Sequence, residues 1–233
     1  MAHSPSRTFL VTGANRGIGL ELTAQLAARG DRVIAACRET TPELDALPGD
    51  AGEGRDAVRV ERGVEVTSDV SVAELAGRLA GVSLDVLVLN AGILVADTLE
   101  TLDFEGARRQ FEVNALGPLR VAKALLPNLH EGSKIAIVTS RMGSIADNGS
   151  GRMYGYRMSK AAVNIAGASL ARDLHPRGIA VALLHPGMVA TEMTGGHGVP
   201  PADAARGLLA RIDELDLAAT GAFRHANGEP LPW

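Results

Sequence analysis

The sequence has little of what several classes of protein require. Its 233 residues include a single cysteine, Cys37, which excludes an internal disulfide, and no histidine suggests itself as the partner of a thiol nucleophile. Aromatic residues make up 3% of the chain and the net charge is −4, whereas nucleic-acid binding usually needs a basic face and stacking platforms. The six histidines form no pair at ligand spacing and no cluster of metal type. We therefore predict no nucleic-acid partner and no metal.

Long apolar runs are also absent. No run approaches the roughly 20 residues that a membrane span needs, and the first residues, "MAHSPSRTFLVTG", lack the basic segment, apolar segment and cleavage site of a secretory signal. We therefore expect a cytoplasmic protein with no membrane partner. The composition that is present, 46% hydrophobic and 21% charged, is that of an ordinary globular protein able to bury a large core.

Short apolar runs alternate with longer helical patterns along nearly the whole chain. The runs expected as strands cover residues 7–13, 31–37, 57–66, 84–90, 133–140, 178–187 and a short last strand within 221–233. The patterns expected as helices cover residues 19–30, 71–81, 103–130 and 155–175, with another helix beginning near residue 204. Such strands, apolar on both faces and separated by helices, predict a doubly wound α/β fold: a mostly parallel, seven-stranded sheet with helices on both faces.

The chain shows no internal boundary. No linker rich in Gly, Ser or Pro separates two cores, no repeat occurs, and the polar loop over residues 40–57 connects two strands rather than two domains. We predict a single domain over residues 1–233.

The first strand runs into "VTGANRGIGLEL", where Gly13, Gly17 and Gly19 precede a helical pattern. Glycines at this place allow a tight turn and let backbone N–H groups and the helix N-terminus approach a pyrophosphate. A glycine trio alone is a weak signal in a chain with 27 glycines, but its position after the first strand indicates a dinucleotide site.

The second strand ends in "AACRET", which decides the expected cofactor. A site for NAD usually has an acidic residue at this strand end, whereas a site for NADP offers arginine to the 2′-phosphate. Arg38 stands at the turn, Glu39 comes one position late, and Arg16 in the glycine loop is a second candidate. Guanidinium groups suit a phosphate, so NADP(H) is favoured over NAD(H). The alternative is that both arginines are solvated surface residues.

The stretch "YGYRMSKAA" holds two tyrosines and one lysine. In a helix Tyr156 and Lys160 share a face, whereas Tyr154 points elsewhere. Reducing a carbonyl with a hydride leaves an alkoxide that must receive a proton, and a tyrosine with a pKa of roughly 10 needs tuning for this task. We expect the ammonium of Lys160 to favour the phenolate of Tyr156.

Several motifs together resemble one family. They are "TGANRGIG" from residue 12, "LNAG" at 89–92, Asn114 in "FEVNALGP", Ser140 in "VTSRMGS", Tyr156 and Lys160 in "YRMSK", and "HPGMVATEM" from residue 185. In order and spacing they resemble the short-chain dehydrogenase/reductase family across nearly the whole chain. The stretches "SRMGSIADN", "YGYRMSK" and "LPW" are similar to its C-factor-like and sniffer-like carbonyl reductases.

The resemblance implies an NAD(P)-binding Rossmann-fold domain with Tyr156 as proton donor, Ser140 on the substrate oxygen, and Lys160 on the nicotinamide ribose. It also implies that Asn114 holds a water of the proton relay through its backbone. Ser144 is a rival to Ser140, which we prefer because it ends an apolar strand, where ligands meet a doubly wound sheet. Asn114 could instead only kink its helix or bond locally.

The cofactor-binding residues implied by the resemblance come from the glycine loop and from the ends of three strands. They are Gly13, Asn15, Arg16, Gly17, Ile18, Gly19, Arg38, Asn90, Ala91, Gly92, Tyr156, Lys160, Pro186, Gly187, Val189 and Thr191.

The sequence departs from the family at the adenine contact and at the substrate lid. Glu65 stands where the family commonly has an aspartate, and Glu65 and Asp69 both stay open as the adenine contact. The segment over 194–203 is short, so we expect an open substrate pocket. His185, just before the last turn, either packs or contacts substrate.

The expected function is an NADPH-dependent oxidoreductase that reduces an aldehyde or ketone, or oxidises the alcohol in reverse. The alternative is an NAD(P)-binding regulatory or signalling protein of the C-factor type that keeps the fold without the chemistry. Family members commonly pair through their long helices, so the resemblance implies a homodimer or homotetramer.

Overall fold

A computed structural model describes residues 6–48 and 57–233 of the protein and places seven strands in one sheet. The strand order is β3-β2-β1-β4-β5-β6-β7, and every neighbouring pair is parallel. The strands are β1 (Thr8–Thr12), β2 (Arg32–Ala36), β3 (Val58–Glu61), β4 (Leu84–Leu89), β5 (Leu129–Val138), β6 (Ala180–His185) and β7 (Ala222–His225). The expected doubly wound fold is confirmed.

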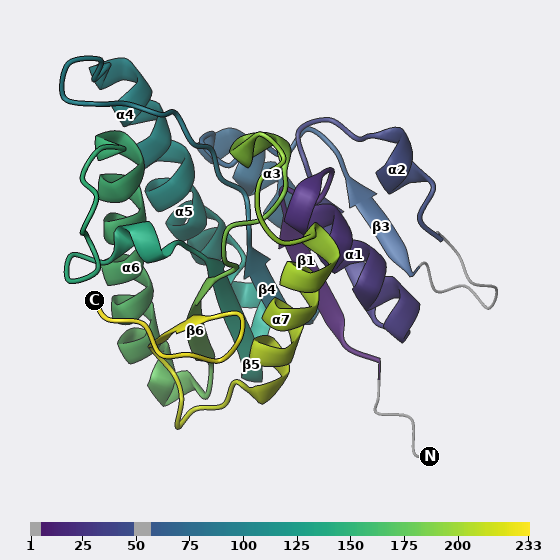
Figure 1. Ribbon diagram of the computed structural model, residues 1–233. Helices are drawn as coiled ribbons and strands as arrows, with labels where there is room; N and C mark the ends of the chain where they lie inside the picture. Colours follow the sequence, from purple (N-terminus) through teal and green to yellow (C-terminus); the bar gives the residue numbers. More distant parts are fainter. Residues whose placement is uncertain (1–5, 49–56) are drawn as a thin grey trace.

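Helices lie on both faces of the sheet (Figure 1). The helices are α1 (Gly17–Arg29), α2 (Pro42–Asp45), α3 (Asp69–Arg78), α4 (Phe104–Phe111), α5 (Gly117–Ala124), α6 (Tyr154–Leu174) and α7 (Pro201–Glu214). One core joins α1 and α7 to alternate strand residues such as Phe9 and Val11, and the other joins α3, α5 and α6 to the residues between them, such as Leu10. The strands are apolar on both faces because both faces are covered.

The order in which strands are added to the sheet reverses between β1 and β4. From β1 the chain goes outward through β2 and β3, and then returns to place β4 on the other side of β1. The carboxyl ends of these two strands therefore open a crevice that no crossover covers, which is where ligands bind in doubly wound folds.

The long helix expected over residues 103–130 is interrupted. A π-helical turn over Glu112–Leu116 separates α4 from α5, and there the N–H of Gly117 bonds to the carbonyl of Glu112. The helix ends at Ala124, since Pro127 in the following short helical turn has no N–H with which to continue it.

The strand expected from Ser133 also begins earlier than predicted. Strand β5 starts at Leu129, which pairs with Leu84, and the register then shifts so that Lys134 pairs with Val86. The residues between form a bulge with Gly132 at φ +90°, a feature that the apolar pattern does not encode. Of the polar loop expected over residues 40–57, Pro42–Asp45 form the short helix α2, and residues 49–56 lie outside the described part.

Candidate active site

The glycine loop turns sharply after β1. Gly13 has φ +66° and donates its N–H to the carbonyl of Ala36 at 2.8 Å. A Cβ on Gly19 would lie 2.1 Å from the carbonyl oxygen of Gly13, so a larger residue would displace the turn. Asn15 accepts the hydroxyl of Thr41 on its carbonyl, and Ile18 packs against the core.

The N-terminus of helix α1 has the features of an anion-binding site. Among the described residues no side chain caps its N-terminus at Arg16, and its first turn contains no acidic residue. The first N–H groups of a helix have no partner within it and attract negative charge. The loop therefore fits the pyrophosphate of a dinucleotide, which the N–H groups at the start of α1, from Gly17 on, would hold.

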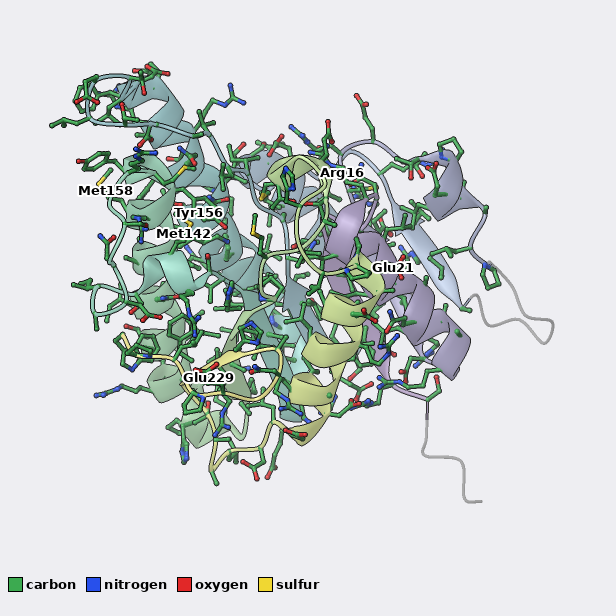
Figure 2. The ribbon with its side chains drawn as sticks, in the orientation of Figure 1. Arg16, Glu21, Met142, Tyr156, Met158 and Glu229 are labelled. Carbon is green, nitrogen blue, oxygen red and sulfur yellow. The ribbon has the colours of Figure 1, made fainter. Side chains whose placement is uncertain are left out.

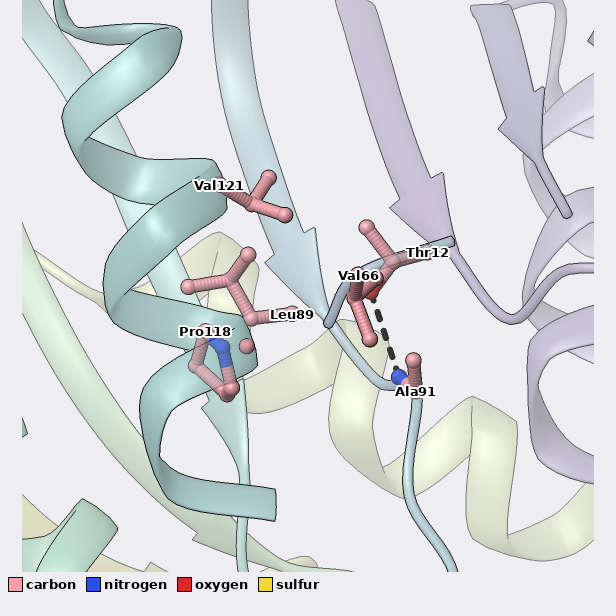
Figure 3. A pocket seen from close by; sticks show the side chains of 7 residues that line it. Thr12, Val66, Leu89, Ala91, Pro118 and Val121 are labelled. Atoms are coloured by element: carbon pink, nitrogen blue, oxygen red, sulfur yellow. Dashed lines mark hydrogen bonds between the residues drawn. The ribbon is translucent and has the colours of Figure 1, made fainter. Parts of the chain in front are cut away.

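The end of β4 is tied to the end of β1. The hydroxyl oxygen of Thr12 accepts the N–H groups of Asn90 at 3.0 Å and of Ala91 at 3.1 Å, and the Asn90 amide donates back to the carbonyls of Thr12 and Gly13. Figure 3 shows the Thr12–Ala91 bond beside a hollow that Val66 and Pro118 also line. These contacts hold Asn90, Ala91 and Gly92 at the crevice, and the Thr12 hydroxyl is an anchor that the motifs by themselves do not reveal.

Two arginines stand at the outer rim of the crevice. The Arg16 side chain, 61% exposed, pairs with Glu192, and the Arg38 side chain, 67% exposed, lies 3.5 Å from Glu65. Both guanidinium groups are therefore accessible to an added phosphate.

The two candidate adenine contacts are placed differently. Glu65 lies beside Arg38 at the rim and accepts the N–H of Thr67. Asp69 pairs with Arg120 on α5. The structure thus places Glu65, rather than Asp69, beside one of the two rim arginines.

Ser140, Tyr156 and Lys160 meet where the end of β5 faces α6. Tyr156 is 8% exposed and lies close enough to the Ser140 side chain for that group to affect its pKa, while the Ser140 Oγ accepts the N–H of Met142 at 3.1 Å. Lys160 is 5% exposed, and its Nζ donates to the carbonyl of Val138 at 3.0 Å and lies 5.8 Å from the centre of the Tyr156 ring. The rival Ser144 instead donates to the carbonyl of Trp233 and accepts the N–H of Asp147.

Burial dominates the electrostatics of this group. It raises the pKa of Tyr156 above its ordinary value of 10.0, against a smaller lowering by the side chain of Ser140. Burial also lowers the pKa of Lys160 to about 8. The expected lowering of the Tyr156 pKa by Lys160 is therefore not what this arrangement produces, because desolvation of the phenolate is the largest effect on that pKa.

Asn114 lies in the π-helical turn with its side chain fully engaged. Its Oδ1 accepts the N–H of Ile93 at 2.8 Å, and its Nδ2 donates to the Ile93 carbonyl and to the hydroxyl of Ser159. Gly92 separates it from Lys160, since a Cβ there would lie 3.2 Å from the Asn114 Oδ1 and 3.7 Å from the Lys160 Nζ. The Asn114 side chain thus bonds to two distant segments of the chain rather than locally, which leaves only its backbone for holding a water.

The loop after β6 closes the other side of the crevice. Gly187, after Pro186, has φ +89°, and Val189 is 3% exposed. A Cβ on Gly17 would lie 3.3 Å from the methyl group of Thr191, so this loop meets the glycine loop. The structure therefore brings the predicted residues of three strand ends to one edge of the sheet.

His185 forms a pair that sequence reasoning missed. Its ring lies 5.0 Å from that of His225 on β7 in an edge-to-face arrangement, and its buried Nδ1 has no hydrogen-bond partner among the described residues. Burial, with smaller effects of His225, Arg141 and Lys160, lowers its pKa to about 4. Since 40 residues separate the two histidines in the sequence (225 − 185), only the strand pairing reveals their contact.

Two classes of feature are missing over residues 6–48 and 57–233. No group of three or more His, Cys, Asp or Glu side chains there could hold a metal ion. None of the helices in the same ranges is long and apolar enough to cross a membrane.

Comparison with known sequences gives two kinds of relative. The sequence model of the family described as short chain dehydrogenase matches residues 7–198. The 1-hydroxy-2-glutathionyl-2-methyl-3-butene dehydrogenase of Rhodococcus sp. (strain AD45) is 47% identical and covers 97% of this chain and 99% of its own. The C-signal protein of Myxococcus xanthus is also 47% identical, over 64% of this chain and 92% of its own.

Comparison with solved structures gives the same picture. An NADPH-bound carbonyl reductase from chicken fatty liver superimposes with a TM-score of 0.88 at 30% identity and covers 98% of this chain and 99% of its own. The carbonyl reductase Sniffer of D. melanogaster superimposes with a TM-score of 0.86 at 28% identity, over 98% of this chain and 100% of its own.

Proposed function

The chain belongs to the short chain dehydrogenase family, and we propose that it is an NADPH-dependent oxidoreductase that reduces an aldehyde or ketone with Tyr156 as the proton donor. The observation that carries the proposal is the buried group of Ser140, Tyr156 and Lys160 at the carboxyl edge of the sheet. Burial keeps the proton on Tyr156 before substrate arrives, so Lys160 must stabilise the phenolate that forms when the proton is transferred.

Each residue of the group has a distinct role in the proposed step. NADPH, when bound, supplies the hydride to the carbonyl carbon. Ser140 donates a hydrogen bond that orients the carbonyl oxygen, and the Tyr156 hydroxyl transfers its proton to that oxygen as charge develops there. Lys160 stabilises the resulting phenolate, and its Nζ would also hold the nicotinamide ribose. The backbone of Asn114 holds a water through which the proton of Tyr156 is restored.

The cofactor assignment rests on the rim arginines. Arg16 and Arg38 are exposed and flank the position at the end of β2 where a 2′-phosphate would lie. Solved structural neighbours include a carbonyl reductase with bound NADPH, which supports the same choice. The remaining cofactor contacts are the backbone of the glycine loop, Asn90–Gly92 and the loop from Pro186 to Thr191.

The names of the relatives suggest two directions for the reaction. The Rhodococcus relative is named a dehydrogenase of a hydroxylated glutathione conjugate, which favours alcohol oxidation, whereas the structural neighbours are carbonyl reductases. The same residues serve both directions, because Tyr156 donates a proton in reduction and accepts one in oxidation.

A second candidate is a cofactor-binding regulatory protein without turnover. The identity of 47% to C-signal is the observation that favours it. The complete set of Ser140, Tyr156 and Lys160 weighs against it, because a binding protein has no need of a buried proton donor.

The protein is further proposed to assemble as a homodimer or homotetramer through α4 and α6. These helices pack on each other and carry exposed apolar side chains at Phe104, Phe111, Met158 and Ile165. Light scattering coupled to gel filtration would give a mass of twice or four times the chain; a monomeric mass at all concentrations would contradict this.

The test of the function is consumption of NADPH and NADH by purified protein over a panel of small aldehydes, ketones and quinones. The matched variant is Tyr156→Phe, which keeps the ring and removes the hydroxyl. We expect turnover with NADPH and a loss of about 10²-fold to 10⁴-fold in kcat in the variant, the usual contribution of a general acid. Full turnover in a folded Tyr156→Phe protein that binds cofactor would contradict the mechanism. Tight cofactor binding by the wild-type protein without turnover on any substrate would favour the regulatory protein.

A further inference from the structure

Asp97 is buried in the loop that follows β4, although aspartate is rarely found inside a protein without partners. Its exposed fraction is 7%, and its partners come from the start of α6. Oδ1 accepts the N–H of Tyr154 at 2.5 Å, Oδ2 accepts the N–H of Gly155 at 3.2 Å, and the Asp97 carbonyl accepts the N–H of Met153 at 2.9 Å. This one residue thus caps the N-terminus of α6 from 57 positions away in the sequence.

The chain enters α6 in a conformation that needs such support. Arg152 and Met153 have φ values of +57° and +54°, which non-glycine residues seldom adopt, and they are the only such residues in the described chain. A left-handed backbone is unfavourable for residues that carry a Cβ. On one side Asp97 holds Met153, and on the other the Arg157 guanidinium donates to the carbonyls of Gly151 and Arg152.

The loop that carries Asp97 is itself fixed at two further points. Asn114 bonds both backbone groups of Ile93, and Gln110, which is fully buried, accepts the N–H of Val95 at 2.9 Å. The first turn of α6 also packs tightly on α4, since a Cβ on Gly155 would lie 2.5 Å from the Gln110 Nε2. Asp97 therefore joins a rigid loop to the first turn of α6.

Tyr156 is the third residue of that turn and follows the Gly155 N–H that Asp97 holds. We propose that Asp97 is a positioning residue that sets the Tyr156 hydroxyl relative to the reacting carbonyl by fixing the start of α6 to the loop after β4. This inference rests on the proposed function of Tyr156 as proton donor. A displacement of about 1 Å at a reacting group can lower the rate about 10²-fold, so a clamp at the start of this helix matters for turnover.

The test compares two Asp97 variants with a matched cap elsewhere. Asp97→Ala removes both side-chain bonds, and Asp97→Asn keeps a single acceptor oxygen. Asp103→Ala is the control, because Asp103 caps α4 in the same way, through the N–H groups of Glu105 and Gly106, but is exposed and local. For all proteins kcat, the KM of the carbonyl, the Kd of NADPH and the melting temperature are measured.

We expect Asp97→Ala to lower kcat by about 10-fold to 100-fold, as a misplaced proton donor would, while the Kd of NADPH changes less than about twofold. Asp97→Asn should recover part of kcat. Asp103→Ala should lower the melting temperature, as loss of a cap does, and leave kcat within about twofold.

A folded Asp97→Ala protein with the wild-type kcat would overturn the inference and leave the proposed function standing. Where Asp97→Ala does not fold, Asp97→Asn decides: a wild-type kcat in it overturns the inference, and a reduced kcat at unchanged cofactor Kd supports it. Absence of turnover in the wild-type protein on every carbonyl would overturn the proposed function and the positioning role with it.

Discussion

The two sides of the crevice hold their side chains in opposite ways. On the acid side Tyr156 and Lys160 are 8% and 5% exposed; Tyr156 lies beside Ser140, and Lys160 bonds to the backbone of β5. On the phosphate side the Arg16 side chain is 61% exposed and pairs with a glutamate. Figure 2 labels Tyr156 on α6 and Arg16 at the start of α1, on opposite sides of the view.

The difference separates reactivity from selectivity. A buried side chain holds its position before substrate arrives. Burial also removes water from its charged form, which raises the pKa of Tyr156 and lowers the pKa of Lys160. Exposed ion pairs contribute only about 0–1 kcal/mol to stability, so the arginine of such a pair can readily exchange its carboxylate partner for a phosphate. Changes on the acid side should therefore act on kcat, and changes at the rim should act on the choice of cofactor.

The largest effect should come from Lys160→Ala, which removes the ammonium that stabilises the phenolate. We expect kcat to fall about 10²-fold to 10³-fold, in the range of a general acid–base contribution. Lys134→Ala is the control, because Lys134 also donates its Nζ to backbone carbonyls, those of Ile212 and Asp213, and burial also lowers its pKa. Equal losses of kcat in the two variants would break the comparison.

The second effect is on stability, through His185 on the acid side. The pKa of His185 is lowered to about 4 in the folded protein, so above pH 6.5 the ring is neutral in both the folded and the unfolded protein. Between pH 6.5 and pH 4 only the unfolded chain gains the proton, so the folded state loses stability as the pH falls. At about 1.4 kcal/mol per pH unit, the free energy of unfolding should fall between pH 7 and pH 4.5 by about 2–3 kcal/mol more in the wild-type protein than in His185→Gln.

Urea unfolding at the two pH values measures this difference, with His175→Gln as an exposed control. A loss of stability in His185→Gln equal to that of the wild type would show that His185 is not buried in the neutral form.

A smaller effect is expected at the rim. Arg38→Ala should raise the KM of NADPH about 10-fold, the equivalent of one charge-assisted hydrogen bond, and leave the KM of NADH and kcat within about twofold. Arg206→Ala, an equally exposed arginine on α7, is the control. Steady-state kinetics with both cofactors makes the test, and an equal rise for NADH would remove Arg38 from 2′-phosphate recognition.

The smallest effect should follow from Glu192→Gln, which frees Arg16 from its ion pair. Because exposed pairs contribute about 0–1 kcal/mol, the KM of NADPH should fall less than about fivefold and that of NADH should stay unchanged. A rise in the KM of NADPH would mean that Glu192 itself contacts the cofactor, which would contradict the simple exchange of partners.

Local patterns were enough for the strands, the glycine turn and the spacing of Tyr156 and Lys160, because each depends on near neighbours in the chain. They were insufficient at residues 103–130, where a π-helical turn and an early strand replace a continuous helix. They also favoured a Tyr156 pKa lowered by Lys160, whereas desolvation decides its direction. Burial depends on the whole fold and has no local signature.

The doubly wound sheet and the glycine turn can be predicted from local patterns, since apolar period, glycines and helical spacing act over a few residues. Packing of the strands and helices places Ser140, rather than Ser144, beside Tyr156, brings His185 against His225, and lets Asp97 cap α6. These contacts join residues far apart in the chain, and their geometry follows from how the strands and helices pack. Long-range hydrogen bonds and desolvation are properties of that packing.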